Sequence, residues 1–157
     1  MNLFPGYISD PTQKARGLSP LHDSGIGSAG SYGNFEVMPL LCPGGFTTCA
    51  TRLAERERYR KNDTDGDVPF LLFLVLLLRN LSDAYPGYFS LTLDNEIKME
   101  ATSTRRAGLE RFTFPSGSKP YFVIDLANDL LGSFAGGEMR IDPDQGRIRI
   151  GGRWSPR

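Results

Sequence analysis

The segment YPGYFSLTLDNEIKMEATSTRRAGLERFTFP, residues 85–115, decides the fold class. Polar and apolar residues alternate in its first part, stop at the turn pair Asp94 and Asn95, and alternate again beyond it. The apolar residues that share one face of these two runs are Phe89, Leu91, Leu93, Ile97, Met99 and Ala101. Two runs with a period of two, joined by a short polar turn, are typical of an antiparallel hairpin.

Further strands are predicted on either side of this hairpin. The segments with a strand pattern are 34–40, 109–114, 121–126, 137–142 and 147–152. Residues 121–126 are nearly all apolar, which predicts a strand buried on both faces. The last two segments flank a turn that begins with Pro143, so they form a second hairpin. Residues 1–34 are dense in Gly, Pro, Ser and Asp and are expected to be a long loop region. The sequence therefore predicts an all-β protein, an antiparallel β-sandwich.

The composition is that of one globular domain. The chain has 157 residues, of which 39% are hydrophobic and 11% aromatic, and 18 basic residues balance 18 acidic ones. No net charge draws it to nucleic acid or to an anionic membrane, so neither is expected as a partner. A basic stretch, residues 52–61, is interpreted as a solvated loop or a short helix face.

The run VPFLLFLVLLL, residues 68–78, fits neither a helical nor an alternating pattern. It is too short for a membrane helix, which needs about 20 apolar residues. A buried strand or core helix is one interpretation. Pyrimidine-rich codons also translate as Phe, Leu, Ser and Pro, so a retained intron would have this composition. We hypothesise that residues 68–82 are such a non-native insert.

The segment GLSPLHDSGIGSAGSYGNF, residues 17–35, contains the only histidine of the chain, His22. Its glycines have neither P-loop nor dinucleotide spacing, so phosphate binding is not predicted. With no second histidine as base, Ser–His hydrolysis within the chain is not expected. Two interpretations stay open. His22, Asp23, Ser24 and Gly25 could contact the hydroxyl groups of a sugar, or the segment could be an Ω-type loop that bonds only its own backbone.

Two cysteines, Cys42 and Cys49, are separated by six residues. No histidine or further cysteine accompanies them at zinc spacing. The residues alone leave two alternatives, a local disulfide in an oxidising compartment or two free thiols.

The segment 17–39 resembles a motif of the amino-terminal domain of glycoside hydrolase family 92, a family of α-mannosidases. The positions that match are Gly17, Ser19, His22, Ser24, Gly25, Gly27, Tyr32, Gly33 and Pro39. Residues 85–115, YFVIDLANDL (121–130) and GGEMRIDPDQGRIRIGGRW (136–154) are similar to later strands of the same domain. Leu18 and Ile26 depart from the usual Phe and Thr, and Pro20 stands where bacterial members often have a second histidine. Cys42 and Cys49 resemble the paired cysteines of fungal secreted members.

The resemblance implies that residues 1–157 are part of a galactose-mutarotase-like sandwich, incomplete in this chain. It implies a fragment of a calcium-dependent inverting exo-α-mannosidase that acts on glycoprotein glycans. The family's acid, base and calcium ligands belong to a helical domain, so no catalytic residue, cofactor or metal ligand is assigned here, and calcium is expected in that missing domain. Whether this chain is itself an enzyme stays open.

The implied partners are mannose-containing glycans and the helical catalytic domain. The alternatives are a stand-alone carbohydrate-binding module and a non-functional truncated product. No secretion signal is visible in the chain, and an extracellular or vacuolar location is expected for the intact family member.

Overall fold

A computed structural model describes residues 14–19, 35–59, 61, 84–85, 88–104, 106–127 and 134–154. The strands in these ranges are β1 (Lys14–Ala15), β2 (Glu36–Leu41), β3 (Arg58–Tyr59), β4 (Ala84–Tyr85), β5 (Tyr88–Thr92), β6 (Lys98–Ser103), β7 (Gly108–Thr113), β8 (Pro120–Asp125), β9 (Phe134–Asp142) and β10 (Arg147–Trp154). The described helices are one turn each, η1 (Phe46–Thr48) and α1 (Leu53–Arg56). Every strand pair is antiparallel, which confirms the predicted all-β class.

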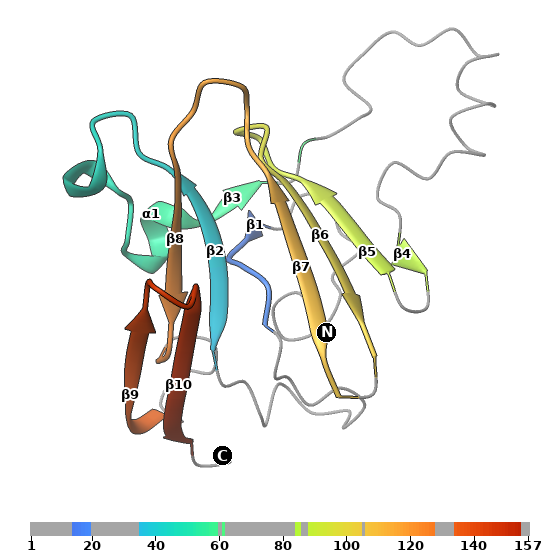
Figure 1. Cartoon of the computed structure of the whole chain (residues 1–157). Coiled ribbons are helices and arrows are strands. Elements are labelled where there is room, and N and C mark those ends of the chain that lie inside the picture. The colour runs from blue at the N-terminus through green and yellow to red at the C-terminus, as the bar shows by residue number, and fades with distance from the viewer. Residues whose placement is uncertain are drawn as a thin grey trace, which may run out of the picture.

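The segment 85–115 forms the largest sheet of the described chain, in the order β4-β5-β6-β7 (Figure 1). The first hairpin pairs Phe89 with Ala101 and Leu91 with Met99, so the alternating apolar residues share one face as predicted. At the turn the Leu93 amide donates to the Ile97 carbonyl at 2.9 Å.

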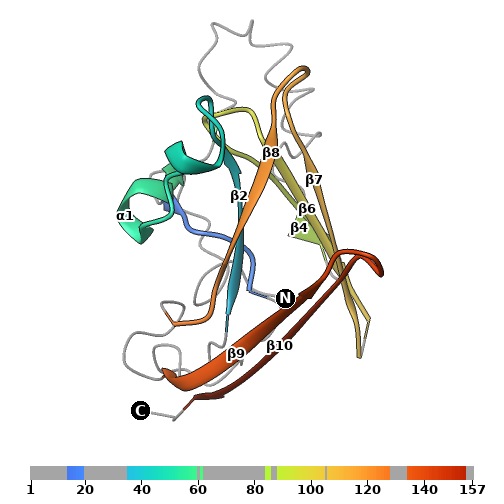
Figure 2. The ribbon, with the colours of Figure 1, turned by 60° about the vertical axis from the view of Figure 1, so that its left-hand side comes forward.

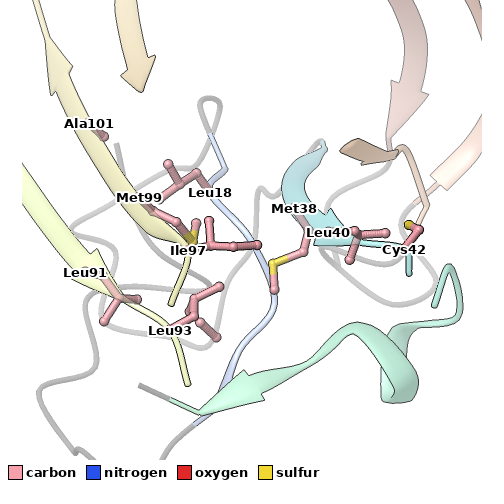
Figure 3. Close-up of a cluster of buried hydrophobic side chains, with 10 residues drawn as sticks. Leu18, Met38, Leu40, Cys42, Leu91, Leu93, Ile97, Met99 and Ala101 are labelled. Carbon is pink, nitrogen blue, oxygen red and sulfur yellow. The ribbon is translucent and has the colours of Figure 1, made fainter. Parts of the chain in front are cut away.

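A second layer is the pair β2-β8, in which Glu36 lies opposite Asp125 and Leu41 opposite Pro120. Figure 2 shows this pair facing the sheet that contains β6 and β7. Figure 3 shows that the core lies between the two layers. Its buried members are Ala15, Leu18, Met38, Leu40, Cys42, Leu91, Leu93, Ile97, Met99 and Ala101. Two sheets closing on one apolar layer make the antiparallel sandwich that the strand pattern predicted.

The prediction that residues 121–126 are buried on both faces is wrong. Phe122 of β8 is 50% exposed, and the other residues of the strand are exposed or half-buried. Among the described strands β8 pairs with β2 alone, so its other side has no strand to cover it. The Phe122 ring packs edge-on against Phe112 and Phe114, with centroids 5.2 and 5.7 Å apart. The exposed face of this apolar strand is therefore covered in part by aromatic rings of the neighbouring layer.

The second predicted hairpin is present as β9-β10, with Ile148 opposite Ile141 and Ile150 opposite Met139. Figure 2 shows this hairpin running obliquely below the β2-β8 pair. The apolar residues of this hairpin are only partly buried, since Ile141 is 67% and Ile148 47% exposed. The hypothesised insert, residues 68–82, lies outside the described residues, so the intron hypothesis stays a prediction. The described chain contains no helix that is long and apolar enough to span a membrane.

Candidate functional site

The two ends of the predicted sugar-binding loop meet at the start of β2. The amide of Leu18 donates to the Val37 carbonyl at 2.9 Å, and the Val37 amide donates back at 2.8 Å. The Ser19 hydroxyl donates to the Phe35 carbonyl at 2.9 Å. We call these four residues the loop stem. The stem therefore brings Leu18 and Ser19, which precede the predicted loop, against Phe35 and Val37, which follow it.

A close backbone contact at the stem explains one glycine of the motif. A Cβ atom at Gly17 would lie 2.7 Å from the Val37 carbonyl oxygen, closer than real Cβ atoms approach. The glycine φ is +156°, a conformation that side chains rarely adopt. Leu18 follows with 1% exposure and is part of the core. Hence Gly17 and Leu18 fasten the start of the loop, and their role is structural.

A buried ionic cluster lies directly beside the stem. Arg56 of α1 donates through Nη2 to Glu36 at 3.3 Å and to Asp125 on the neighbouring strand. The Arg16 Nε atom lies 4.0 Å from the second oxygen of Glu36. The side chains of Arg56 and Glu36 are each 1% exposed. A short helix, α1, is present within residues 52–61, as one of the two interpretations expected. The expectation of a solvated face is wrong for Arg56, because two carboxylates that face each other across β2-β8 need a buried cation between them.

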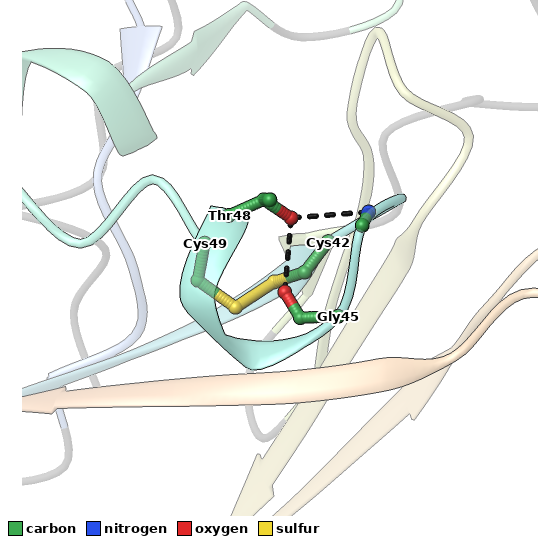
Figure 4. Close-up of a disulfide and its surroundings, with 5 residues drawn as sticks. Cys42, Gly45, Thr48 and Cys49 are labelled. Carbon is green, nitrogen blue, oxygen red and sulfur yellow. Dashed lines mark hydrogen bonds between the residues drawn. A yellow bond between two sulfur atoms is a disulfide. The ribbon is translucent and has the colours of Figure 1, made fainter.

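A disulfide joins Cys42 at the end of β2 to Cys49, with Cα atoms 4.8 Å apart (Figure 4). Inside its loop the Thr48 hydroxyl accepts from the Gly44 amide at 3.0 Å and donates to the Gly45 carbonyl at 2.9 Å. Of the two alternatives for these cysteines, the structure has the local disulfide. The bridge shortens the connection from β2 to α1 and so restricts where Arg56 can lie.

The outward face of the large sheet has a second polar cluster. Glu100 of β6 accepts from Arg111 Nε at 2.7 Å, from Arg111 Nη2 at 2.8 Å and from the Tyr88 hydroxyl at 2.7 Å. Lys98 Nζ lies 3.2 Å from the same carboxylate. The bidentate Arg111 contact, followed by the Tyr88 bond, lowers the pKa of Glu100 to about 2. The bond to Glu100 and burial raise the pKa of Tyr88.

This cluster borders a shallow hollow of about 230 Å³. The residues that line it are Tyr88, Glu100, Ala101, Thr102, Leu109 and Arg111. We call it the outer-face hollow. It lies where β6 ends and β7 begins, and Figures 1 and 2 place this turn at the same end of the sandwich as the start of β2.

On the opposite face of the same sheet, Glu110 is paired with Ala101, a core residue. Burial raises the pKa of Glu110 from its ordinary 4.5 to about 7. The two carboxyl groups of neighbouring strands therefore have opposite environments. Glu100 is held ionised by a guanidinium, whereas Glu110 meets the apolar interior.

The predicted sugar-binding residues His22, Asp23, Ser24 and Gly25 lie outside the described residues, so their interactions stay predictions. Calcium needs a shell of several oxygen ligands. Within the described ranges no group of three or more His, Cys, Asp and Glu side chains could hold a metal ion.

The sequence reasoning did not identify the two polar clusters. Arg56 reaches partners 20 and 69 positions away in the chain. Glu100 and Arg111 meet only because the register of β6-β7 places them opposite each other. The alternating pattern does indicate that both face away from the core, and this is the one signal that could have paired them.

Comparisons with known proteins identify the family of the chain. Residues 4–156 match the model of the glycosyl hydrolase family 92 N-terminal domain. The chain is 30% identical to an uncharacterized secreted glycosidase of Arthroderma benhamiae, over 98% of this chain and 18% of that protein. A solved structure, the family GH92 inverting mannosidase of Bacteroides thetaiotaomicron, superposes over 91% of this chain and 16% of its own with a TM-score of 0.61. At 17% identity the latter shows the fold alone.

The chain thus spans less than a fifth of the length of either protein. The predicted resemblance to family 92 is confirmed by a match that runs through both hairpins and the loop stem. On this match, the chain belongs to glycosyl hydrolase family 92 as its N-terminal domain.

Proposed function

We propose that this chain forms the sugar-binding wall of the active-site cleft of an inverting exo-α-mannosidase that acts on mannose-containing glycans of glycoproteins. The match of residues 4–156 to the family's N-terminal domain carries the proposal. The loop stem supports it, because a loop whose two ends are fixed to the sandwich can present side chains at a defined place.

Each proposed binding residue has a chemical role. His22, Asp23 and Ser24 supply directed donors and acceptors for sugar hydroxyl groups. Gly25 has no side chain, so the backbone can approach the ring closely. The proton donor and the base that activates water are carboxyl groups of a helical catalytic domain in this proposal. Calcium, which would orient the sugar hydroxyls, is proposed for that domain as well.

An extracellular or vacuolar location is part of the proposal. The Arthroderma benhamiae relative is described as secreted. The disulfide Cys42–Cys49 fits an oxidising compartment, where such bonds persist.

Binding of methyl α-mannoside to the 157-residue protein tests the loop. The ligand is titrated into isotope-labelled protein and backbone amide shifts are followed by NMR. Amides within residues 17–35 should shift in the wild type, and His22→Ala should weaken binding about tenfold through the loss of one directed hydrogen bond. Ser28→Ala, in the same loop but outside the matched motif, is the control and should bind as the wild type does. Equal affinity of the His22→Ala and control variants would contradict the role of His22.

A separate experiment tests the proposal that this chain binds sugar while the catalytic carboxyl groups lie in another domain. The isolated chain should release no mannose from an α-mannobioside, because the proposal puts both catalytic carboxyl groups elsewhere. Mannose release that survives purification and is abolished by a substitution in this chain would refute this division. A chain that binds no sugar at all would favour the truncated, non-functional alternative over both binding interpretations.

A further inference from the structure

The outer-face hollow combines a fixed polar edge with an apolar floor. The register places Tyr88 opposite Thr102 and Glu100 opposite Arg111, so the polar groups stand in adjacent rows of one face. Leu109, beside them, is 68% exposed although it is a large apolar residue. Single exposed leucines are common on proteins. This one, however, lines a concave surface whose polar groups are already held in place.

The guanidinium of Arg111 is prepared to donate hydrogen bonds outward. Two of its five N–H groups bind the Glu100 carboxylate at 2.7 and 2.8 Å, which fixes the plane of the group. Its side chain is nevertheless 72% exposed. Within the described part of the chain its remaining N–H groups have no other protein partner. A donor fork fixed in this way loses little conformational entropy when a ligand binds.

Charge argues against an anionic ligand as the main occupant. The Glu100 carboxylate borders the hollow and its pKa is well below neutral, so it is ionised. It is shared between Arg111, which lines the hollow, and Lys98, which lies 3.2 Å from the carboxylate but does not line the hollow. A phosphate placed against Arg111 would meet this carboxylate as well, and like charges at close range repel. A neutral hydroxyl pair avoids that repulsion and can accept from the guanidinium.

From these observations we infer that the outer-face hollow is a second saccharide-binding site that takes one neutral pyranose ring. Vicinal hydroxyl groups of the ring would accept from Arg111, and the C–H surface of the ring would lie on Leu109. A volume of about 230 Å³ is below the about 300–1,000 Å³ of sites for larger ligands, which suits a single ring. The turn from β6 to β7, next to the hollow, lies at the same end of the sandwich as the start of β2 (Figures 1 and 2).

The inference is tested by NMR titration of the full chain with methyl α-mannoside. The choice of mannose rests on the proposed function, whereas the hollow and its chemistry do not. Amides of Thr102, Leu109 and Arg111 should shift together, and Arg111→Gln should weaken this binding about tenfold. Leu109→Ser leaves the Glu100–Arg111 contact intact and should weaken it as well. Arg140→Gln is the matched control, because Arg140 is also exposed on a strand and lies 3.8 Å from a glutamate.

The outcomes separate this inference from the proposed function. If His22→Ala abolishes every mannoside-induced shift while Arg111→Gln and Leu109→Ser change none, the hollow is not a site and the loop proposal stands. If the two hollow variants lose the shifts at β6-β7 and His22→Ala keeps them, the second site is supported whatever the loop does. Absence of any shift at β6-β7, or a stronger response of these amides to inorganic phosphate than to the sugar, would overturn the inference.

Discussion

Glu110 is expected to destabilise the domain at neutral and alkaline pH, so Glu110→Gln should stabilise it there. The side chain lies opposite the core residue Ala101, and its pKa in the folded protein is about 7 against an ordinary 4.5. Because the folded pKa exceeds the unfolded one, the folded state holds a proton that the unfolded state releases. The contribution of Glu110 to stability is therefore most favourable below about pH 4.5 and is lost as the pH rises through about 7.

The size of the effect follows from the same two values. Each unit of pKa difference corresponds to about 1.36 kcal/mol, so ionising Glu110 in the folded state costs at most about 3 kcal/mol. The side chain is half-buried, and water screens part of this cost. We therefore expect Glu110→Gln to raise the free energy of unfolding by about 1–2 kcal/mol at pH 8 and to leave it nearly unchanged at pH 4.5.

Urea denaturation followed by far-UV circular dichroism at several pH values measures this difference. Glu100→Gln is the contrasting variant, because the pKa of Glu100 is lowered to about 2. The stability that Glu100 contributes is present above about pH 4.5 and is lost as the pH falls towards 2, so this variant should be weaker than the wild type at pH 7. Glu138→Gln, at a 72% exposed position, should leave the free energy of unfolding unchanged at every pH. A Glu110→Gln protein as stable as the wild type at pH 8, or a gain of equal size at both pH values, would refute the reasoning.

Three further substitutions test the anchoring of the loop stem. Arg56→Met leaves the buried carboxylate of Glu36 without its closest cation and should lower the free energy of unfolding by about 3–5 kcal/mol; a loss below about 1 kcal/mol in urea denaturation would show that the cluster is not buried in solution. Cys49→Ser opens the small loop that begins at Cys42 and should cost about 2–3 kcal/mol, a loss that dithiothreitol should reproduce in the wild type but not add to in the variant. Gly17→Ala forces a Cβ atom against the Val37 carbonyl and should cost about 2 kcal/mol or more, measured as a lower thermal midpoint; an unchanged midpoint would mean that the stem shifts freely.

The strands and the candidate loop could be predicted from the sequence because their patterns depend on residues that are neighbours in the chain. Alternation with a period of two assigns Phe89 and Met99 to one face whatever the partner strands are. The turn pair at Asp94 located the turn, which in the structure extends to Glu96 and closes between Leu93 and Ile97. The match of Gly17 and its neighbours to a family motif located the candidate loop before any geometry was known, and the steric contact at Val37 explains why that glycine is needed.

The two wrong predictions concern burial, which depends on strand pairing between segments distant in the sequence and not on the composition of each segment. The apolar strand β8 was expected in the middle of a sheet, but it pairs with β2 alone among the described strands, and Phe122 is covered from the other layer. Arg56 was expected in solvent because it lies in a charged stretch. It is buried because Glu36 and Asp125 happen to face each other in the register of β2-β8.

The amino-acid order by itself predicted the longer strands, both hairpins, the position of the candidate loop and the family, since each shows as a pattern of residues close together in the chain. It did not predict the two-residue strands β1 and β3, which lie in segments expected to be loop or a short helix. Only the tertiary structure decided which charges are buried together and where a hollow opens on the sheet. Those features depend on the register between segments distant in sequence, and a change of one residue in register would turn Arg111 from the outer face to the core.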